Sequence, residues 1–564
     1  MMNKALLGTM VMIGMVASGQ AVETPPPNFI IFYVDDLGWA DTSVAMMDGE
    51  PLSKSDFYHT PHLERLAERG MRFSNGYSPT PTCTGSRMSI QYGMTSARVQ
   101  YRNVFDVLSK KQRPNGWDNE VSMAAVVKAA DKNYITAIFG KGMGSRRMDH
   151  AGYDVTDEFD TGANGNGHGS YIDVKKKIRI PDNNPKRIVD LTKRSVDFVK
   201  EHAGKRPFYL MVSHYAVHVP FQASPQAIER CRQRWLAMGR PDVDSTDGNY
   251  KKTDEYRDWQ YAAMIEETDA NLGALLDALE KAGELKNTYI IFTSDNGGGK
   301  GWRDENGNRF NGPLQEGKRS TFEGGLRVPF VVAGPGIKPG SQCDVPVVQW
   351  DLLPTLHDLS SSHTSLPTGV DGGSLRDVFE RGNQGTVVRG APGLIFHYPC
   401  HYHPPVSVIR IGDYKLMRHL NSGEMKLFNV AEDYREQHDL AAEMPEKTAE
   451  LDRIRQRYIN KVDGGRVADV YAAYVEFLDD AEQKAESSFQ KKMETLEQTN
   501  PPDIDVQKTR LKNELEKKKR ELYAKRRINK AHMSNHSWRE GAKKEAMERM
   551  GVDKKGNVLV PKSK

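Results

Sequence analysis

The sequence predicts an α/β fold in which a large mixed, mainly parallel sheet is sandwiched by helices, followed by a smaller C-terminal subdomain and a helical tail. Four apolar runs of strand length alternate with helix-like segments, which is typical of parallel sheets. Each run ends in charged or imidazole residues. From about residue 394 the runs become short and alternating, which indicates a small antiparallel sheet.

The four predicted strands are continuous apolar stretches, the pattern of strands that are buried on both faces. They are NFIIFYVDD (28–36), NYITAIFGKG (133–142), RPFYLMVSHYAVHVP (206–220) and NTYIIFTSDNGGG (287–299). The helices expected between the strands cover 62–70, 121–132, 187–202 and 254–283. Because ligands bind beyond the carboxyl ends of parallel strands, we expect the polar residues that end these runs to share one crevice.

The composition of the 564 residues, 38% hydrophobic and 27% charged, is that of a soluble globular protein with more than one domain. The expected parts are an α/β domain over 28–390, an antiparallel-sheet subdomain over 391–465 and a charged helical extension over 466–564. Within the extension, 466–498 and 508–530 are helix-prone and are separated by the breaker NPPDID.

The basic charge of the chain is concentrated in its tail. Residues 501–564 hold 19 Lys+Arg against 9 Asp+Glu, whereas the whole chain carries a net charge of only +4. The favoured interpretation of the tail is a solvated or packing helix, and a polyanion-binding arm is the alternative. No nucleic-acid partner is expected.

The N-terminus has the pattern of a signal peptide over 1–21. Lys4 supplies the positive charge, residues 5–17 form the apolar run, and 19–21 offer a small-x-small cleavage site. An uncleaved anchor is the alternative, and no other stretch is apolar enough to span a membrane. We therefore expect an exported, periplasmic or secreted protein without a transmembrane segment in the mature chain. Its four cysteines are too few for a disulfide scaffold, although one bridge stays open.

Oxygen-bearing side chains end two of the predicted strands. Asp35 and Asp36 follow the first strand, and Asp295 and Asn296 follow the last. Carboxylates held this close need a compensating cation. All-oxygen ligation favours calcium or magnesium over zinc, so the two pairs predict a divalent metal site. Either pair alone would be interpreted as a solvated loop or a helix cap.

A lone cysteine lies in the stretch SPTPTCTGSRMS (78–89). The residues after Cys83 are compatible with a short helix, whose positive N-terminus lowers a thiol pKa and attracts anions. Arg87 lies one turn further on and can face the same point. Three more groups, Lys141, His218 and Lys318, add positive charge or donate protons. Together with a metal these residues make a pocket for a tetrahedral oxyanion ester.

Many segments of the chain resemble those of type I sulfatases of the alkaline-phosphatase-like superfamily, especially bacterial polysaccharide sulfatases. The similarity runs from about residue 28 to 460. It includes NFIIFYVDDLGW, TPHLERLAERGMRFSNGY, PTCTGSR, FGKG, HVPFQ, IIFTSDNGG, EGKRSTFEGGLRVPFVVAGPG, VVQWDLLPTLHDL and IGDYKL. The resemblance implies that a separate formylglycine-generating enzyme converts Cys83 to formylglycine (3-oxoalanine), whose hydrate is the nucleophile.

The resemblance also implies a role for each site residue. A divalent cation, calcium or else magnesium, would be bound by Asp35, Asp36, Asp295, Asn296 and an oxygen of modified Cys83. Arg87 and Lys141 would orient the hydrated aldehyde. Lys318 and His218 would bind the sulfate, and one of them would protonate the departing alcohol. Apart from these roles, Glu323 and Arg327 in TFEGGLRVP are expected to hold structure behind Lys318, with a catalytic role as the weaker alternative.

The chain departs from the family pattern at two positions. Gly85 stands where the family has proline or alanine, and Met143 stands where it usually has histidine in GKWH. Methionine cannot transfer protons. His150 and His168 are the candidates to replace that histidine, with surface or substrate contacts as the alternative for each.

The resemblance implies an enzyme that hydrolyses sulfate esters of a carbohydrate, a sulfated polysaccharide or its oligosaccharides. The segment FHYPCHYHPP (396–405), with His397, His401 and His403, is expected at the substrate rim, or else is a packed loop. One alternative function is a phosphonate or phosphodiester hydrolase of the same superfamily. Another is a non-catalytic relative that binds sulfated polysaccharide.

Overall fold

The main sheet has eight strands in the order β11-β2-β10-β9-β1-β8-β4-β5. The computed structural model describes residues 25–99, 101, 121–143, 151–157, 171–173, 178–179, 183–240, 258–299, 311–399, 405–420, 422–462 and 467–535. The strands of this sheet are β1 (Asn28–Val34), β2 (Met71–Phe73), β4 (Ile135–Gly140), β5 (Val155–Thr156), β8 (Phe208–Ser213), β9 (Thr288–Ser294), β10 (Phe330–Ala333) and β11 (Ser341–Cys343). β10 is antiparallel to both of its neighbours, and the remaining pairs are parallel, so the predicted mixed, mainly parallel sheet is confirmed.

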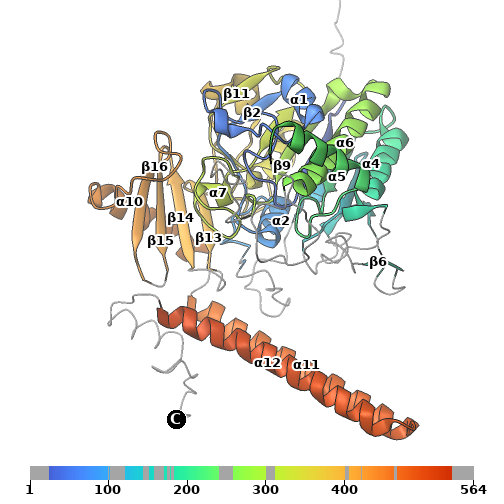
Figure 1. The fold of residues 1–564 in the computed structure, drawn as a ribbon. Coiled ribbons are helices and arrows are strands. Elements are labelled where there is room, and N and C mark those ends of the chain that lie inside the picture. Colours follow the sequence, from blue (N-terminus) through green and yellow to red (C-terminus); the bar gives the residue numbers. More distant parts are fainter. Residues whose placement is uncertain are drawn as a thin grey trace, which may run out of the picture.

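Helices cover both faces of this sheet (Figure 1). The apolar side chains along β1 alternate between the two faces, so both faces need a covering layer. Ile30 and Phe32 pack into one core with the helices α1 (Pro61–Glu68), α4 (Ile188–His202), α5 (Pro225–Ala237) and α6 (Asp258–Lys281). Phe29 and Ile31 point to the other face. That face is covered by α2 (Cys83–Tyr92), α3 (Met123–Ala130), α8 (Leu352–Leu359) and α9 (Arg376–Arg381). Short elements complete this part: β3 (Gly76–Tyr77), β12 (Val347–Val348), β6 (Tyr171–Asp173), β7 (Ile178–Arg179), η5 (Pro185–Arg187) and α7 (Glu323–Leu326).

Four neighbouring parallel strands in the middle of the sheet position the site. Their order is β9-β1-β8-β4, and their register pairs Ser294 with Val34, Tyr33 with Ser213, and Ser213 with Gly140. Because the four strands run in the same direction, their carboxyl ends meet at one edge. The polar residues that follow them therefore converge, as the sequence predicted.

A separate antiparallel sheet follows in the C-terminal region. It contains β13 (Leu394–Tyr398), β14 (Val406–Ile411), β15 (Tyr414–His419) and β16 (Met425–Asn429), in that order. One face packs Val408 and Met417 against Tyr77 and Trp350 of the main body. The other face packs against α10 (Pro445–Val462). The main body thus shares a core with the small sheet, while the domain boundaries at 390 and 465 stay a prediction.

A long helical hairpin ends the described chain. It is formed by α11 (Val467–Thr499) and α12 (Ile504–Asn535), which pack side by side (Figure 1). α11 carries 3 Lys+Arg against 8 Asp+Glu, and α12 carries 11 against 4. Ion pairs from Lys508 to Glu497 (2.9 Å) and from Lys519 to Glu486 (2.5 Å) join the helices. Lys508 and Lys519 of the basic tail thus pair with acidic side chains of α11, which supports the interpretation as a packing helix.

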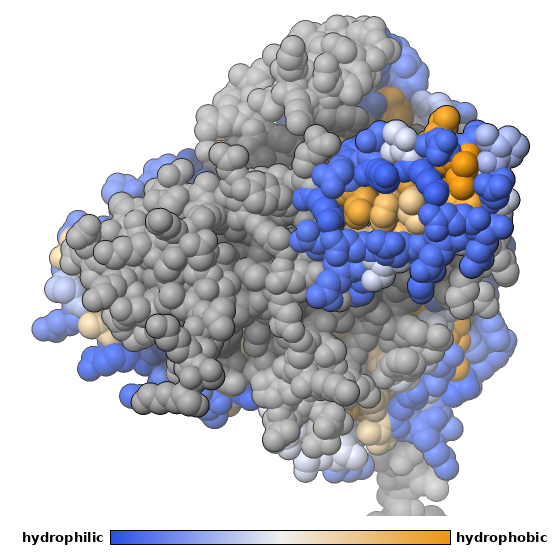
Figure 2. All heavy atoms as spheres, turned by 90° about the horizontal axis from the view of Figure 1, so that it is seen from below, coloured by the Kyte–Doolittle hydropathy of each residue, from blue (hydrophilic) through white to orange (hydrophobic). Residues whose placement is uncertain are grey.

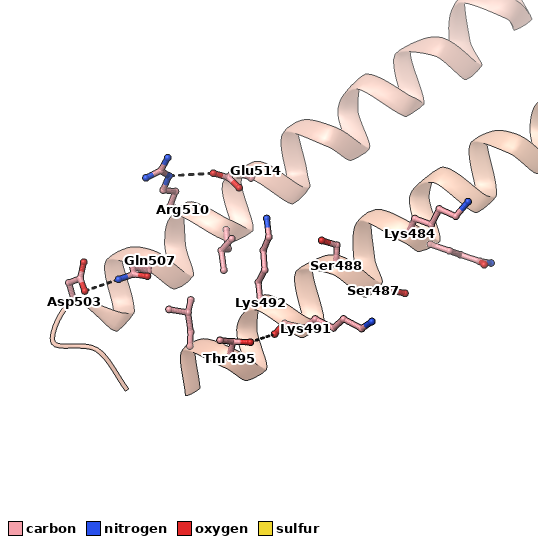
Figure 3. A pocket seen from close by; sticks show the side chains of 13 residues that line it. Lys484, Ser487, Ser488, Lys491, Lys492, Thr495, Asp503, Gln507, Arg510 and Glu514 are labelled. Atoms are coloured by element: carbon pink, nitrogen blue, oxygen red, sulfur yellow. Dashed lines mark hydrogen bonds and ion pairs between the residues drawn. The ribbon is translucent and has the colours of Figure 1, made fainter. Parts of the chain in front are cut away.

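The hairpin buries little apolar surface. Within the part of it whose side chains the structure describes, 481–519, no residue is fully buried. Figure 2 shows apolar side chains in a strip between two polar rows on its outer face. A groove of about 1070 Å³ runs between the two helices and is lined mainly by polar and basic side chains, among them Lys484, Lys491, Lys492 and Arg510 (Figure 3).

None of the described helices is long and apolar enough to cross a membrane. Of the cysteines in the described part of the chain, Cys83, Cys231 and Cys343 are all free thiols. The fourth, Cys400, and the predicted signal peptide over 1–21 lie outside the described residues.

Candidate functional site

The turns after β1 and β9 are tied to each other and to the chain after β8. The backbone N–H of Asp295 donates to the carbonyl of Val34 (3.0 Å), and that of Asp35 donates to the carbonyl of Ala216 (2.9 Å). Asp36 has a left-handed backbone (φ 64°), and its N–H donates to Asp295 Oδ1 (3.1 Å). These bonds hold the two pairs of oxygen-bearing side chains at one edge of the sheet, as the sequence predicted for Asp35, Asp36, Asp295 and Asn296.

Cys83 is the first residue of α2, so the predicted short helix is confirmed. Thr82 is its extended N-cap residue, and the hydroxyl of Ser86 accepts from the N–H of Thr80 (3.1 Å) and donates to its carbonyl (2.9 Å). This local bonding fixes how the chain enters the helix. The thiol of Cys83 and one oxygen each of Asp35 and Asp295 all lie within 4.8 Å of one another.

Gly85 lies beneath the ring of Tyr101, in a space that leaves no room for a larger residue. A Cβ atom there would lie 2.7 Å from Tyr101 Cδ1 and 2.8 Å from Thr80 Oγ1. The Tyr101 hydroxyl lies 2.8 Å from Thr82 Oγ1, which holds the ring in place. Thr80 and Tyr101 thus fill the volume that the proline or alanine of related motifs would need.

Gly85→Ala is therefore expected to destabilise the protein by up to about 2 kcal/mol, because an overpacking cost of about 1–3 kcal/mol outweighs the gain of roughly 1 kcal/mol in helix propensity. Urea unfolding of both proteins measures the difference. Thr84→Ala, in the same helical turn and only half-buried, is the matched control and should change stability little. A stabilised Gly85→Ala protein would mean that the side chains of Tyr101 and Thr80 move aside at little cost in free energy.

Arg87 and Lys141 each pair with a carboxylate of the site. Arg87 Nε donates to Asp295 Oδ2 (2.9 Å), and another of its nitrogens donates to the carbonyl of Lys141 (3.1 Å). The ammonium of Lys141 forms an ion pair with Asp35. Burial alone would raise the pKa of Asp35, but Lys141, with smaller contributions from other basic groups of the site, holds it well below its usual value.

Three further groups surround Asp36. Lys318 Nζ lies 2.6 Å from Asp36 Oδ2, and His218 Nε2 lies 3.7 Å from the same oxygen. Asn296 Nδ2 donates to Asp36 Oδ1 (2.9 Å). The Lys318 backbone is fixed by its N–H bond to the carbonyl of Gly298 (2.8 Å). The structure thus brings together the full set predicted for metal and catalysis: Asp35, Asp36, Cys83, Arg87, Lys141, His218, Asp295, Asn296 and Lys318.

The oxygen donors of this set fit a divalent cation. Asp35 Oδ1 and Asn296 Oδ1 are buried and have no hydrogen-bond partner among the described residues. Buried polar atoms are rarely left without a partner, which indicates a missing ligand. Burial and the neighbouring charge of Asp35 raise the pKa of Asp295 to about 7. A cation bound by Asp35, Asp36, Asp295 and Asn296 would supply the missing partner and relieve this repulsion.

Five histidines were predicted to contact the substrate. His397 is on β13 and is only 1% exposed. Its place at the substrate rim stays a prediction. His150, His168, His401 and His403 lie outside the described residues. Met143 is buried in an apolar cluster.

Sequence reasoning missed two buried basic groups near the site. His214 is held against Asn271, and burial lowers its pKa to about 3, so it is neutral at physiological pH. Lys186, just before α4, is fully buried. No sequence signal separated Lys186 from the many other lysines, because its burial depends on how α4 meets the sheet.

Behind Lys318, a buried ionic cluster joins the main body to the small sheet. Glu323 pairs with Arg327 (2.7 Å) and with Lys415 of β15 (2.8 Å), and it accepts from the Tyr77 hydroxyl (2.6 Å). Lys415 also pairs with Glu436 (2.8 Å). Glu323 and Arg327 therefore hold structure, as the resemblance implied.

Comparisons with known proteins identify relatives of this chain. A family model described as Sulfatase matches residues 27–362. N-acetylgalactosamine-6-sulfatase from Mus musculus is 28% identical over 354 residues, which cover 57% of this chain and 60% of that protein. An ulvan-active sulfatase from Formosa agariphila is 27% identical over 476 residues, which cover 78% of this chain and 85% of that protein. The chain thus spans about 60% of the length of the mammalian relative.

The fold is also similar to solved structures. The crystal structure of Ps i-CgsB in complex with k-i-k-neocarrahexaose superposes with a TM-score of 0.61 at 23% sequence identity. The superposition covers 77% of this chain and 93% of that one. This likeness concerns the fold, including the large sheet and the small C-terminal sheet.

Proposed function

Since this chain belongs to the sulfatase family, we propose that it hydrolyses sulfate esters of a carbohydrate, a sulfated polysaccharide or its oligosaccharides. The observation that carries the proposal is the convergence of Cys83 with two buried carboxylates and the cations of Arg87 and Lys141. The names of the relatives support a sulfated sugar as substrate, since they act on N-acetylgalactosamine-6-sulfate or ulvan.

Formylglycine, made from Cys83 by a separate enzyme, supplies a hydrated aldehyde as nucleophile, and a divalent cation, calcium in this proposal, supplies charge neutralisation. Asp35, Asp36, Asp295 and Asn296 hold the cation. Arg87 and Lys141 fix the position of the reacting side chain at the N-terminus of α2.

Lys318 and His218 act on the substrate. Both lie beside Asp36, so a sulfate group at this point would find two nitrogen donors. Burial lowers the pKa of His218, although Asp36 opposes this effect. One of the two groups, Lys318 or His218, protonates the departing alcohol.

The division of labour along the chain is part of the proposal. Residues 28–390 form the catalytic domain. Residues 391–465 form a subdomain that packs against the catalytic domain, and residues 466–564 are an extension that hydrolysis does not require. Export, with removal of residues 1–21, gives access to extracellular polysaccharide.

Parallel assays with sulfate, phosphate and phosphonate esters, on a panel of sulfated sugars, test the proposed reaction. We expect sulfate release only. Mass spectrometry of the tryptic peptide FSNGYSPTPTCTGSR (73–87), from protein made in its native host, should show Cys83 as the aldehyde. Faster phosphate release would move the chain to the phosphoester-hydrolysing relatives, and an unmodified thiol without turnover would favour a binding protein.

The affinity for calcium is expected to fall as the pH drops below 7. The pKa of Asp295 is raised to about 7 by burial and by the charge of Asp35, so in the cation-free protein a proton occupies this carboxylate at lower pH. A cation must displace that proton, which weakens binding by up to about tenfold per pH unit. Calcium titrations between pH 5.5 and 8 measure the slope. Asp295→Asn removes the titrating group, and its slope should be flatter.

A further inference from the structure

Tyr33 and Gln349 are two fully buried residues that the proposed mechanism does not use. Tyr33 lies on β1, and Gln349 begins the short helix η7 (Gln349–Asp351). The Tyr33 hydroxyl donates to Gln349 Oε1 (2.7 Å). Burial raises the pKa of Tyr33 well above its usual value, so the hydroxyl keeps its proton for this bond. A buried phenol and a buried amide are costly unless they are hydrogen-bonded, so each fixes the position of the other.

The ring of Tyr33 supports the guanidinium of Arg87. Arg87 Cζ lies over this ring, 4.9 Å from its centroid. Arg87 is buried, and a cation–π contact is strongest where water is excluded. Arg87 also donates hydrogen bonds to Asp295 (2.9 Å) and to the carbonyl of Lys141 (3.1 Å). These bonds act at the edges of the planar guanidinium, so the ring beneath it limits how far the group can tilt.

Gln349 ties this ring to the strand that leads to Asp295. Gln349 Nε2 donates to the carbonyl of Ser294 (2.6 Å), the residue before Asp295, and to Thr293 Oγ1 (3.0 Å). Tyr33 of β1 and Thr293 of β9 are paired neighbours in the sheet. One amide therefore bonds a side chain on β1 and the backbone of β9. The ring that supports the guanidinium and the carboxylate that pairs with it are held by the same side chain.

We propose that Tyr33 and Gln349 are positioning residues for Arg87 in the hydrolysis of the sulfate ester. They hold its guanidinium in the orientation from which it acts on the side chain made from Cys83. The inference rests on the proposed function, which gives Arg87 that task. It extends the function by assigning a role to two residues outside the metal and nucleophile set. Because orientation matters most when the reacting geometry is reached, this pair should affect kcat rather than KM.

Steady-state kinetics of the full-length, native-host protein, on a sulfate ester that the wild type hydrolyses, test this role. Tyr33→Leu should lower kcat by about thirtyfold, the effect of losing a buried cation–π contact, with KM nearly unchanged. Tyr33→Phe keeps the ring and loses only the hydroxyl bond, so kcat should fall by about fivefold. Gln349→Leu should lower kcat at least as much. Adding Tyr33→Phe to Gln349→Leu should lower kcat no further, because both changes remove the same bond.

The NMR signal of the Arg87 Nε–H gives a readout that does not depend on turnover. Its loss in Arg87→Lys identifies it. Aromatic ring currents shift protons above a ring face upfield, so Tyr33→Leu should move this signal downfield. Tyr33→Phe, which keeps the ring, should move it much less.

Tyr209→Phe is the matched control. Tyr209 is also fully buried, its hydroxyl accepts from that of Tyr153 (3.1 Å), and it lies near the amino end of β8, away from the site. This variant loses a buried hydroxyl bond of the same kind, but it should keep kcat and the Arg87 signal close to the wild type.

The pattern across these variants separates positioning from general damage. Equal losses of kcat in Tyr33→Leu and Tyr209→Phe would overturn the proposal, as would a raised KM with unchanged kcat or an Arg87 signal that stays in place. Tyr33→Phe and Gln349→Leu decide the question if Tyr33→Leu does not fold. A wild-type protein that releases no sulfate from esters would overturn the proposed function too. Normal wild-type hydrolysis with unchanged kcat in Tyr33→Leu would overturn this inference alone.

Discussion

Cys83→Ala is expected to lower kcat/KM for a sulfate ester on the order of a millionfold, as when the nucleophile of a covalent hydrolase is removed. The variant loses the only side chain at the N-terminus of α2 that can become the reacting group, while Arg87, Lys141 and the oxygen donors stay. Initial rates of sulfate release, followed with a substrate that the wild type hydrolyses, give the ratio.

Cys343→Ala is the matched control for this prediction. Cys343 is also a free and buried thiol, but it lies on the edge strand β11. Its removal should leave kcat/KM within a few-fold of the wild type. Activity of the Cys83→Ala protein above one per cent of wild type, with the fold intact by circular dichroism, would mean that another group attacks the substrate.

Lys415→Met is expected to destabilise the folded protein by about 3–5 kcal/mol, because the removal of one partner of a buried ion pair leaves an uncompensated charge. Lys415 and its partners Glu323 and Glu436 are all shielded from water. Burial already raises the pKa of Glu436 to about 7. Without Lys415 this carboxyl must stay protonated in the folded state, so the loss of stability should be larger at pH 8 than at pH 5.5.

Urea unfolding of the wild type and the Lys415→Met variant at the two pH values measures this effect. Lys461→Met, an exposed lysine on α10, is the control and should change stability by less than about 0.5 kcal/mol. An equal loss at both pH values would argue that packing of the lysine stem, rather than its charge, matters. The variant should also lose activity, because Glu323 supports the segment that carries Lys318.

The sequence was sufficient to predict the four central strands of the large sheet. β1, β4, β8 and β9 are continuous apolar runs, and their length and composition are compatible with few structures other than buried strands. It also placed Cys83 at a helix start, since small polar residues precede the helical pattern. For α6, expected over 254–283, the structure gives Asp258–Lys281; residues 254–257 lie outside the described residues, and the two-residue difference at the C-terminus is ordinary for a helix end.

What the sequence could not predict depends on contacts between distant segments. The position of Tyr101 above Gly85 and the burial of Lys186 both depend on which distant segments meet. The burial of His397 on β13 also depends on how distant strands pair, which its aromatic-rich segment does not show. Lys415, the partner of Glu323 in the small sheet, lies 92 residues further along the chain, and local sequence carries no sign of this pair.

The pairing of β1 with β9 can form only late in the synthesis of the chain. Asn28 and Thr288 are 260 residues apart, so this pairing waits until the ribosome has delivered more than half of the chain. Pairings that close such long loops form slowly. Cys83 is only 8% exposed in the finished structure and lies under packed side chains. Conversion of Cys83 to formylglycine by the maturation enzyme must therefore take place after Cys83 is translated and before β9 pairs with β1. Slowed elongation upstream of Thr288 should therefore raise the converted fraction.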